Sequence, residues 1–126
     1  MKEVRTDRAP QPVALYSQGI LYGNFIFTSG QLGIDPETGN LREGFREQSV
    51  QALKNLIAVV EAAGGSRCSI VKVNVFLTDI SKFSEFNAVY EEFFRNCPVK
   101  PCRSAVGVKE LPLGAEVEVE CVAIRG

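Results

Sequence analysis

The sequence predicts an α+β fold: one domain, residues 1–126, in which two helices pack on one face of a mixed sheet. The apolar patterns follow the order strand, strand, helix, strand, helix, strand, strand. A length of 126 residues suits a single domain. No repeat, linker or low-complexity segment divides the chain.

Extended segments are expected near the start of the chain. Residues 13–15, 20–22 and 25–29 are rich in β-forming side chains. Gly23 and Asn24 separate the second segment from the third. A Gly-Asn pair between two such segments predicts a β-hairpin.

Two amphipathic helices are predicted, over residues 45–63 and 83–94, because apolar residues recur there at steps of three and four. The glycines at 64–65 are a stop signal for the first helix. Ser81 is expected to cap the second helix, and Pro98 follows its end.

Three further strands are predicted over residues 70–77, 103–108 and 116–124. Two helices cover only one face of the sheet, so its other face stays bare. Four apolar side chains are expected on that bare face: Ile70, Phe76, Val122 and Ile124. A half-apolar bare face predicts self-association, and a monomer with a solvated face is the less favoured alternative.

The charge of the chain argues against several partners. Fourteen basic and fifteen acidic residues give a net charge of −1, without a basic stripe. We therefore expect no nucleic-acid partner and no membrane-surface partner. The charged residues 1–8 lack the apolar core of a secretory signal, which favours a cytoplasmic location.

The chain has four cysteines and no histidine. The cysteines are expected to be free, mostly buried thiols; they are Cys68, Cys97, Cys102 and Cys121. Without histidine, His-ligated metals, Ser-His and Cys-His nucleophiles and a histidine base are excluded, and no metal site is expected. Catalysis would depend on carboxylate, arginine, tyrosine, hydroxyl or backbone groups.

Arg103 and the glutamates of residues 116–120 are the main candidates for chemistry. Strand alternation places these glutamates on one face, and a hairpin pairing of the last two strands would bring Arg103 close to one of them. An arginine fork is a strong anchor for the carboxylate of a ligand. The ordinary alternatives are a surface arginine and a solvated strand face.

Four more residues are candidates for lining a site. Tyr16 is either a pocket residue or a half-buried aromatic. Ser29 and Gly30 end a strand, where the glycine admits close approach of a ligand or simply forms a turn. Asn87 lies on the apolar stripe of the second helix, where it contacts a ligand or, more commonly, holds a loop.

Taken together, seven segments resemble the RidA family of reactive-intermediate deaminases, also called the YjgF family. They follow one another through nearly the whole chain: YSQG at 16–19, FTSGQ at 27–31, VVEAAG at 59–64, IVKVNVFLTD at 70–79, FNAVYEEFF at 86–94, RSAV at 103–106 and VEVECVAIR at 117–125. No single segment is decisive, but the ordered set is specific.

The resemblance implies a chorismate-mutase-like fold and a homotrimer with clefts between its subunits. It implies hydrolysis of 2-imino acids, or of enamine tautomers such as 2-aminoacrylate, to 2-keto acids and ammonia, without a cofactor. By the same resemblance, Arg103 binds the substrate carboxylate, Glu118 positions the attacking water and Tyr16 is a catalytic pocket residue. Residues with substrate-binding roles are implied at four further positions: Ser29, Gly30, Asn87 and Ala105.

The chain departs from the family pattern at two places. Ala105 stands where the family often has cysteine, which leaves only a backbone N–H there and excludes thiol chemistry. Ala14 and Leu15 stand where the family often has Gly-Pro before the tyrosine, so the entry loop is expected to differ in shape. Two alternative functions stay open: an endoribonuclease-type translation inhibitor, and a non-catalytic regulatory trimer that binds small carboxylates.

Overall fold

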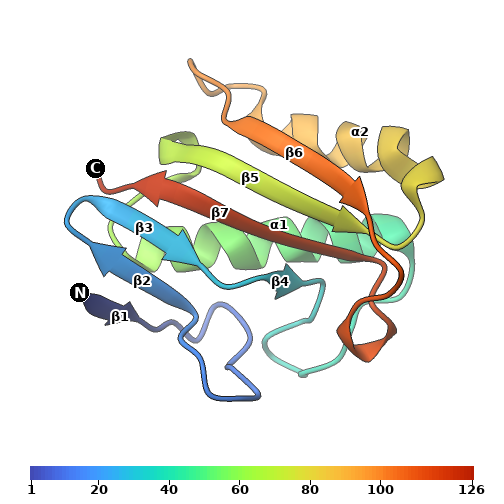
Figure 1. Ribbon diagram of the computed structural model, residues 1–126, viewed down its shortest axis with the longest axis horizontal. Helices are drawn as coiled ribbons and strands as arrows, with labels where there is room; N and C mark the ends of the chain where they lie inside the picture. The colour runs from blue at the N-terminus through green and yellow to red at the C-terminus, as the bar shows by residue number, and fades with distance from the viewer.

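The computed structural model describes residues 1–126 and contains one seven-stranded sheet with two helices (Figure 1). The strands are β1 (Lys2–Val4), β2 (Gly19–Tyr22), β3 (Phe25–Thr28), β4 (Gln31–Leu32), β5 (Ile70–Leu77), β6 (Cys102–Gly107) and β7 (Val117–Ile124). The helices are α1 (Phe45–Ala62) and α2 (Phe83–Phe94), with short 3-10 turns η1 (Arg67–Ser69), η2 (Ile80–Lys82) and η3 (Pro112–Gly114). Neither α-helix is long and apolar enough to cross a membrane.

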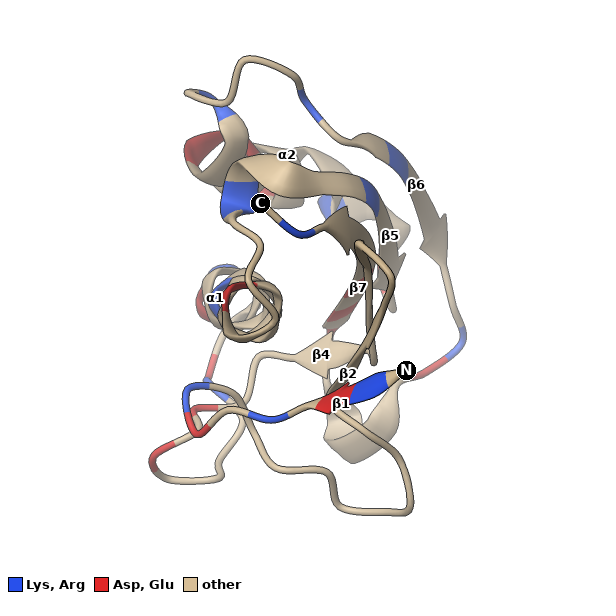
Figure 2. Cartoon of the chain, turned by 90° about the vertical axis from the view of Figure 1, so that its left-hand side faces the viewer, with Lys and Arg blue, Asp and Glu red and all other residues tan.

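The sheet is mixed, and both helices lie on one of its faces. The strand order is β1-β2-β3-β7-β5-β6, with β4 also paired to β7. Only β5 and β6 run parallel; the other pairs are antiparallel. In the view of Figure 2, both helices lie to the left of the strands and no helix lies to their right. The predicted architecture of a mixed sheet with two helices on one face is therefore confirmed.

The beginning of the chain agrees with the prediction only in part. The hairpin of β2 and β3 forms, and Gly23 takes the positive φ of 60° that its turn requires. The strand predicted over residues 13–15 is wrong, because that segment belongs to a loop of bends. Two short strands, β1 and β4, were not predicted, since segments of three and two residues leave almost no periodicity to detect.

The helix ends follow their local chemistry. Helix α1 stops at Ala62, and Gly64 adopts a φ of 93°, as expected for a glycine stop signal. The prediction that Ser81 caps α2 is wrong. Asp79 instead accepts a hydrogen bond from the Ser81 backbone N–H at 3.0 Å and caps η2, which continues directly into α2.

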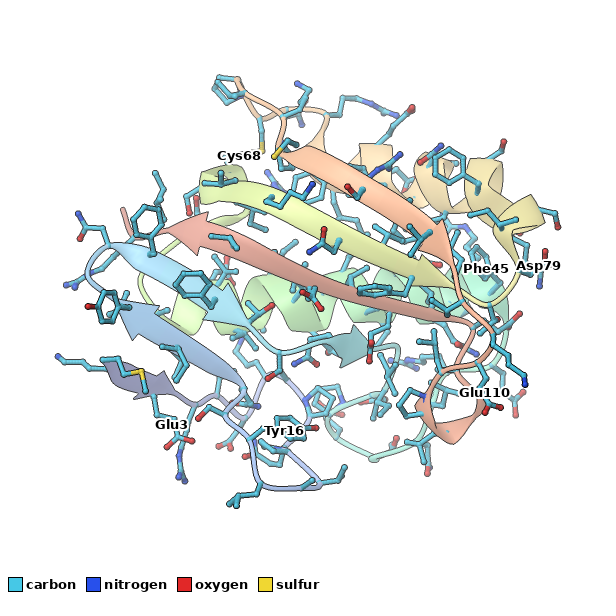
Figure 3. All side chains as sticks on the ribbon, viewed as in Figure 1. Glu3, Tyr16, Phe45, Cys68, Asp79 and Glu110 are labelled. Atoms are coloured by element: carbon cyan, nitrogen blue, oxygen red, sulfur yellow. A yellow bond between two sulfur atoms is a disulfide. The ribbon has the colours of Figure 1, made fainter.

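Apolar side chains remain on the bare face of the sheet, which faces the viewer in Figure 3. Phe25 and Phe27 of β3 are 52% and 45% exposed, and they pair with Ile124 and Val122 of β7. Ile70 does not join this face as predicted: an irregularity between Ile70 and Lys72 turns it toward the helices, where it is 4% exposed.

The cysteines are not all free thiols. Cys68 in η1 and Cys97, which follows α2, form a disulfide across 29 residues of sequence, whereas Cys102 and Cys121 are free. The expectation of four free thiols is therefore wrong for this pair. The spacing of the cysteines in the sequence does not reveal the Cys68–Cys97 pair, because the two residues come together only through the packing of η1 beside the end of α2.

Candidate functional site

Arg103 lies on the helix-covered face of the sheet, where α2 holds its side chain. Its register partner in β5 is Val73, which is fully buried beneath the helices. The Arg103 Nη1 donates a hydrogen bond to Asn87 Oδ1 at 2.8 Å. Its guanidinium carbon lies 4.7 Å from the ring centre of Tyr90 and 5.2 Å from that of Phe83. We call Phe83, Asn87 and Tyr90 the Arg103 cradle.

The Arg103 cradle fixes the guanidinium while occupying few of its donors. The Arg103 side chain makes a single hydrogen bond within the chain, the one to Asn87, which leaves most of its five N–H groups free. Each ring contact adds about 0.5–1 kcal/mol of cation–π attraction at a partly exposed site. Burial raises the pKa of Tyr90 to about 12, against the lowering effect of Arg103, and its hydroxyl has no hydrogen-bond partner. An arginine held in this way is suited to bind an incoming carboxylate.

Ala105 belongs to the same side of the sheet as Arg103. It pairs with the buried Val75 of β5 and packs partly against the core. The structure therefore groups three of the predicted residues, Arg103, Asn87 and Ala105, on β6 and α2. These two elements form one edge of the molecule (Figure 1).

Glu118 lies on the bare face of the sheet, in a separate cavity of about 650 Å³. The cavity also brings together Tyr16 and Gly30, and its other walls are mostly apolar side chains that include Leu32 and Leu113. We call it the Glu118 cavity. Figure 3 shows Tyr16 on the loop that precedes β2, at the border of the sheet.

Gly30 allows the Glu118 carboxylate to occupy its position. A Cβ at residue 30 would lie 2.8 Å from Glu118 Cδ and 3.0 Å from Glu118 Oε2. Burial, and secondarily the charge of Glu120, raise the pKa of Glu118 above its usual range. The raised pKa favours a carboxyl group that both accepts and returns a proton.

Ser29 has a positioning role within the chain. Its hydroxyl donates to the Ser17 carbonyl at 2.6 Å, and its backbone N–H donates to the Gln18 carbonyl at 2.9 Å. Both donors are thus used to tie the end of β3 to the loop that carries Tyr16. A substrate-binding role for Ser29 stays a prediction; within the chain its hydroxyl proton is bonded to the Ser17 carbonyl.

Within one chain, Arg103 and Glu118 lie on opposite faces of the sheet. Arg103 is paired with the helix-facing Val73, whereas Glu118 is paired with Phe76, and side chains alternate between faces along β5. The hairpin pairing predicted for the last two strands is wrong, because β5 lies between β6 and β7. The predicted residues therefore form two half-sites, one in the Arg103 cradle and one in the Glu118 cavity.

No sequence pattern indicated a role in a site for three residues that support the half-sites: Gln18, Phe83 and Tyr90. Gln18 is 2% exposed, accepts from the Thr6 N–H and donates to the carbonyls of Thr6, Ala9 and Pro10. It therefore shapes the loop beside the Glu118 cavity. The aromatic stripe of α2 was visible in the sequence, but nothing indicated that Arg103 would lie over it.

Comparison with known proteins gives consistent matches along the whole chain. The family model described as endoribonuclease L-PSP matches residues 6–125. The chain is 54% identical to a RutC family protein of Aquifex aeolicus, over 99% of this chain and 100% of that protein. It is 41% identical to the 2-iminobutanoate/2-iminopropanoate deaminase of Salmonella typhimurium, over 98% of each chain.

Solved structures share the fold closely. The structure of E. coli TdcF with bound serine has a TM-score of 0.96 and 38% sequence identity, over 100% of both chains. The E. coli YjgF gene product has a TM-score of 0.96 and 40% identity, also over 100% of both chains.

Proposed function

The chain belongs to the family of RidA- and YjgF-type proteins, whose family model is described as endoribonuclease L-PSP, and we propose that it is a cofactor-independent imine deaminase. Its proposed substrates are small 2-imino acids and their enamine tautomers, such as 2-aminoacrylate, and its products are 2-keto acids and ammonia. The observation that carries the proposal is full-length similarity to proteins named 2-iminobutanoate/2-iminopropanoate deaminase, at 41% identity. The proposed location is the cytoplasm.

The proposed active site forms between copies of the chain. Arg103 and Glu118 face opposite sides of one sheet, so a single chain does not present both to one small molecule. The bare face carries exposed aromatic residues such as Phe25 and Phe27, which favour burial against another copy. We propose a closed homotrimer in which the Arg103 cradle of one subunit completes the Glu118 cavity of its neighbour.

Arg103 is proposed to bind the substrate carboxylate. One N–H is committed to Asn87, and the remaining donors are available for a two-point contact with two carboxylate oxygens. Fixing the substrate in this way converts a bimolecular attack into a positioned one. The bound serine in the E. coli TdcF structure supports a small ligand with a carboxylate in this family.

Glu118 is proposed to hold the attacking water and to move its proton. On the protonated imine, the water oxygen bonds to the imine carbon, the C=N electron pair moves to nitrogen, and the carboxylate takes a water proton, which gives a neutral carbinolamine. Glu118 then returns this proton to nitrogen, and the C–N bond breaks as the hydroxyl oxygen forms the carbonyl. The hydroxyl proton passes through the Glu118 carboxylate to the departing ammonia, which leaves as ammonium. Its raised pKa supports this cycle, because a carboxylate with a higher pKa accepts a proton from water more readily, and the protonated carboxyl can still pass it to the more basic amine nitrogen. Tyr16 and Gly30 border the same cavity and are proposed to complete its wall.

Mixed assemblies of two inactive variants test the proposal. Arg103→Ala and Glu118→Ala are prepared separately, unfolded together and refolded, and keto-acid release is followed in a coupled assay with a serine or threonine dehydratase. Each variant alone is expected to be inactive or strongly impaired. Random mixing at equal amounts restores both residues in about one quarter of the shared sites, so about one quarter of the wild-type rate is expected.

The same assay separates the alternatives. If Arg103→Ala alone keeps full activity, the assigned role of the arginine is wrong, and absence of recovery on mixing contradicts a site shared between chains. A wild-type protein that binds a keto acid without accelerating imine hydrolysis would be a binding trimer instead. Degradation of RNA by nuclease-free protein, with Arg103→Ala as control, would favour the ribonuclease named in the family description.

A further inference from the structure

A second cavity, of about 580 Å³, lies on the helix side of the molecule, away from both half-sites. It is bordered by α1, by the turn η1 and by Phe93 of α2, and we call it the outer pocket. The outer pocket shares no residue with the bare face or with the Arg103 cradle, so the proposed trimer would leave it open. Nothing in the proposed deaminase mechanism uses it.

The outer pocket carries an excess of positive charge. Its single carboxylate, Glu61, is paired with Arg8 at 2.6 Å. The two remaining charged residues, Lys54 and Arg67, are exposed cations, and neither has a carboxylate within 4.0 Å. An anion entering the outer pocket therefore meets two cations that no carboxylate of the chain neutralises.

One half of the disulfide is also part of the outer pocket. Cys68 is exposed and borders the cavity next to Arg67, whereas its partner Cys97 is 2% exposed. Thiol–disulfide exchange depends on which sulfur the attacking thiolate can reach. The geometry therefore directs attack to Cys68, with Cys97 as the leaving group.

We propose that the outer pocket binds small thiols that carry a carboxylate, and that Cys68 is the site where they exchange with the disulfide. The thiolate sulfur bonds to Cys68 Sγ while the bond between Cys68 and Cys97 breaks. The electron pair of the broken bond leaves on the Cys97 sulfur, which then takes a proton from water. The products are a mixed disulfide at Cys68 and a free thiol at Cys97, so no further oxidant or reductant is needed.

The exchange would break the disulfide, which is a covalent link between two segments far apart in the sequence. The disulfide joins η1, which leads into β5, to the segment just after α2. The thiol adduct is therefore expected to melt at a lower temperature than the intact protein, because a closed loop constrains the unfolded chain. The positive charges of Lys54 and Arg67 attract an anionic thiol. The adduct forms on Cys68 because this residue is the exposed half of the disulfide.

A charge series of small thiols tests the proposal on the full-length, air-oxidised protein. The probes are 3-mercaptopropionate, 2-mercaptoethanol and cysteamine, which carry a negative, a neutral and a positive tail. Exchange is stopped with acid at early times and measured by intact mass. Each rate is divided by the thiolate concentration and by the rate constant of the same thiolate with a small uncharged disulfide, because nucleophilicity rises with the pKa of the thiol. We expect the anionic thiol to react about threefold or more faster than the cationic one at roughly 10 mM salt, and this ratio to approach one near 1 M salt.

Charge variants and peptide mapping complete the test. The double variant Lys54→Gln with Arg67→Gln is expected to lose the charge preference, whereas Lys109→Gln, an exposed lysine outside the outer pocket, is expected to keep it. Peptide mass spectrometry is expected to find the adduct on Cys68. Equal rates for the three thiols, an adduct on Cys97, or four free thiols in the oxidised protein would each overturn the proposal.

Discussion

The Arg103 guanidinium donates to the Asn87 side-chain oxygen at 2.8 Å, and this contact joins the edge strand β6 to helix α2. The two residues are 16 positions apart in sequence. The amide oxygen of Asn87 accepts one guanidinium N–H without adding a negative charge, so the cation remains available to an anionic ligand. Asn87 thus orients Arg103 without neutralising its positive charge.

Replacing Asn87 with alanine is expected to weaken substrate binding more than turnover. Hydrogen bonds to a charged group contribute about 1.5–3 kcal/mol, and the lower end applies at a partly exposed site, so KM is expected to rise roughly tenfold. Steady-state kinetics of imine hydrolysis measures the split between KM and kcat. Ser84→Ala on the exposed side of α2 is the matched control, and an unchanged KM for Asn87→Ala would contradict the orienting role of the residue.

A Cβ at position 30 is expected to displace the Glu118 carboxylate without unfolding the chain. The new atom would lie 2.8 Å from Glu118 Cδ, which is near the end of a flexible side chain and can move aside. Gly30→Ala should therefore lower kcat while the melting temperature changes little. In the background of Glu118→Ala, the same change should cost nothing further; an additional loss of activity would show that residue 30 acts independently of Glu118.

The decline of kcat/KM at acidic pH should depend on Glu120. Glu118 must be ionised to accept a proton from water, so its raised pKa shifts the loss of activity on acidification toward higher pH. Glu120 is one cause of the raised pKa, since like charges oppose ionisation. Glu120→Gln is therefore expected to lower the pKa of Glu118 and to move the acidic limb of kcat/KM to lower pH. Glu116→Gln, whose carboxylate is paired with Lys82 at 2.9 Å, should leave that limb unchanged.

Changing Gln18 to glutamate should loosen the loop that carries Tyr16. The amide of Gln18 donates to three carbonyls of the segment Thr6–Pro10, and a glutamate oxygen cannot replace these donations. Leaving buried acceptors unpaired costs about 1–3 kcal/mol each, so a loss of at least 2 kcal/mol in unfolding free energy is expected. Denaturant unfolding measures the loss, and hydrogen exchange should show faster opening of residues 6–16. Equal protection of this loop in Gln18→Glu and wild type would contradict its anchoring role.

A charge at Phe27 should disrupt the proposed trimer. Phe27 is 45% exposed on the bare face and pairs with Val122. Burying an unpaired carboxylate there on assembly would be unfavourable, so Phe27→Glu is expected to be smaller than wild type by light scattering and to lack deaminase activity. Val99→Glu, at a residue that is 77% exposed outside the sheet, is the control and should behave like wild type. A wild-type mass for Phe27→Glu would exclude this face from the interface.

The sequence indicated which residues belong to the candidate site better than it indicated how they are arranged in space. Period-two alternation correctly placed Glu118 and Glu120 on one face of their strand, because strand geometry acts over neighbouring residues. The relation of Glu118 to Arg103 was predicted wrongly, since it depends on which strand lies between β6 and β7. That strand is β5, which ends 25 positions before β6 begins, and no local pattern encodes its insertion.

By itself, the sequence determined the two amphipathic helices, the hairpin at Gly23, and the presence of a bare face on the sheet. Each of these follows from side-chain periodicity or from the φ preference of a single residue, which are short-range properties of the chain. Only the tertiary structure decided the Cys68–Cys97 disulfide, the Gln18 contacts and the separation of Arg103 from Glu118. These features depend on distances between segments far apart in sequence, and packing of the whole sheet against α1 and α2 sets those distances.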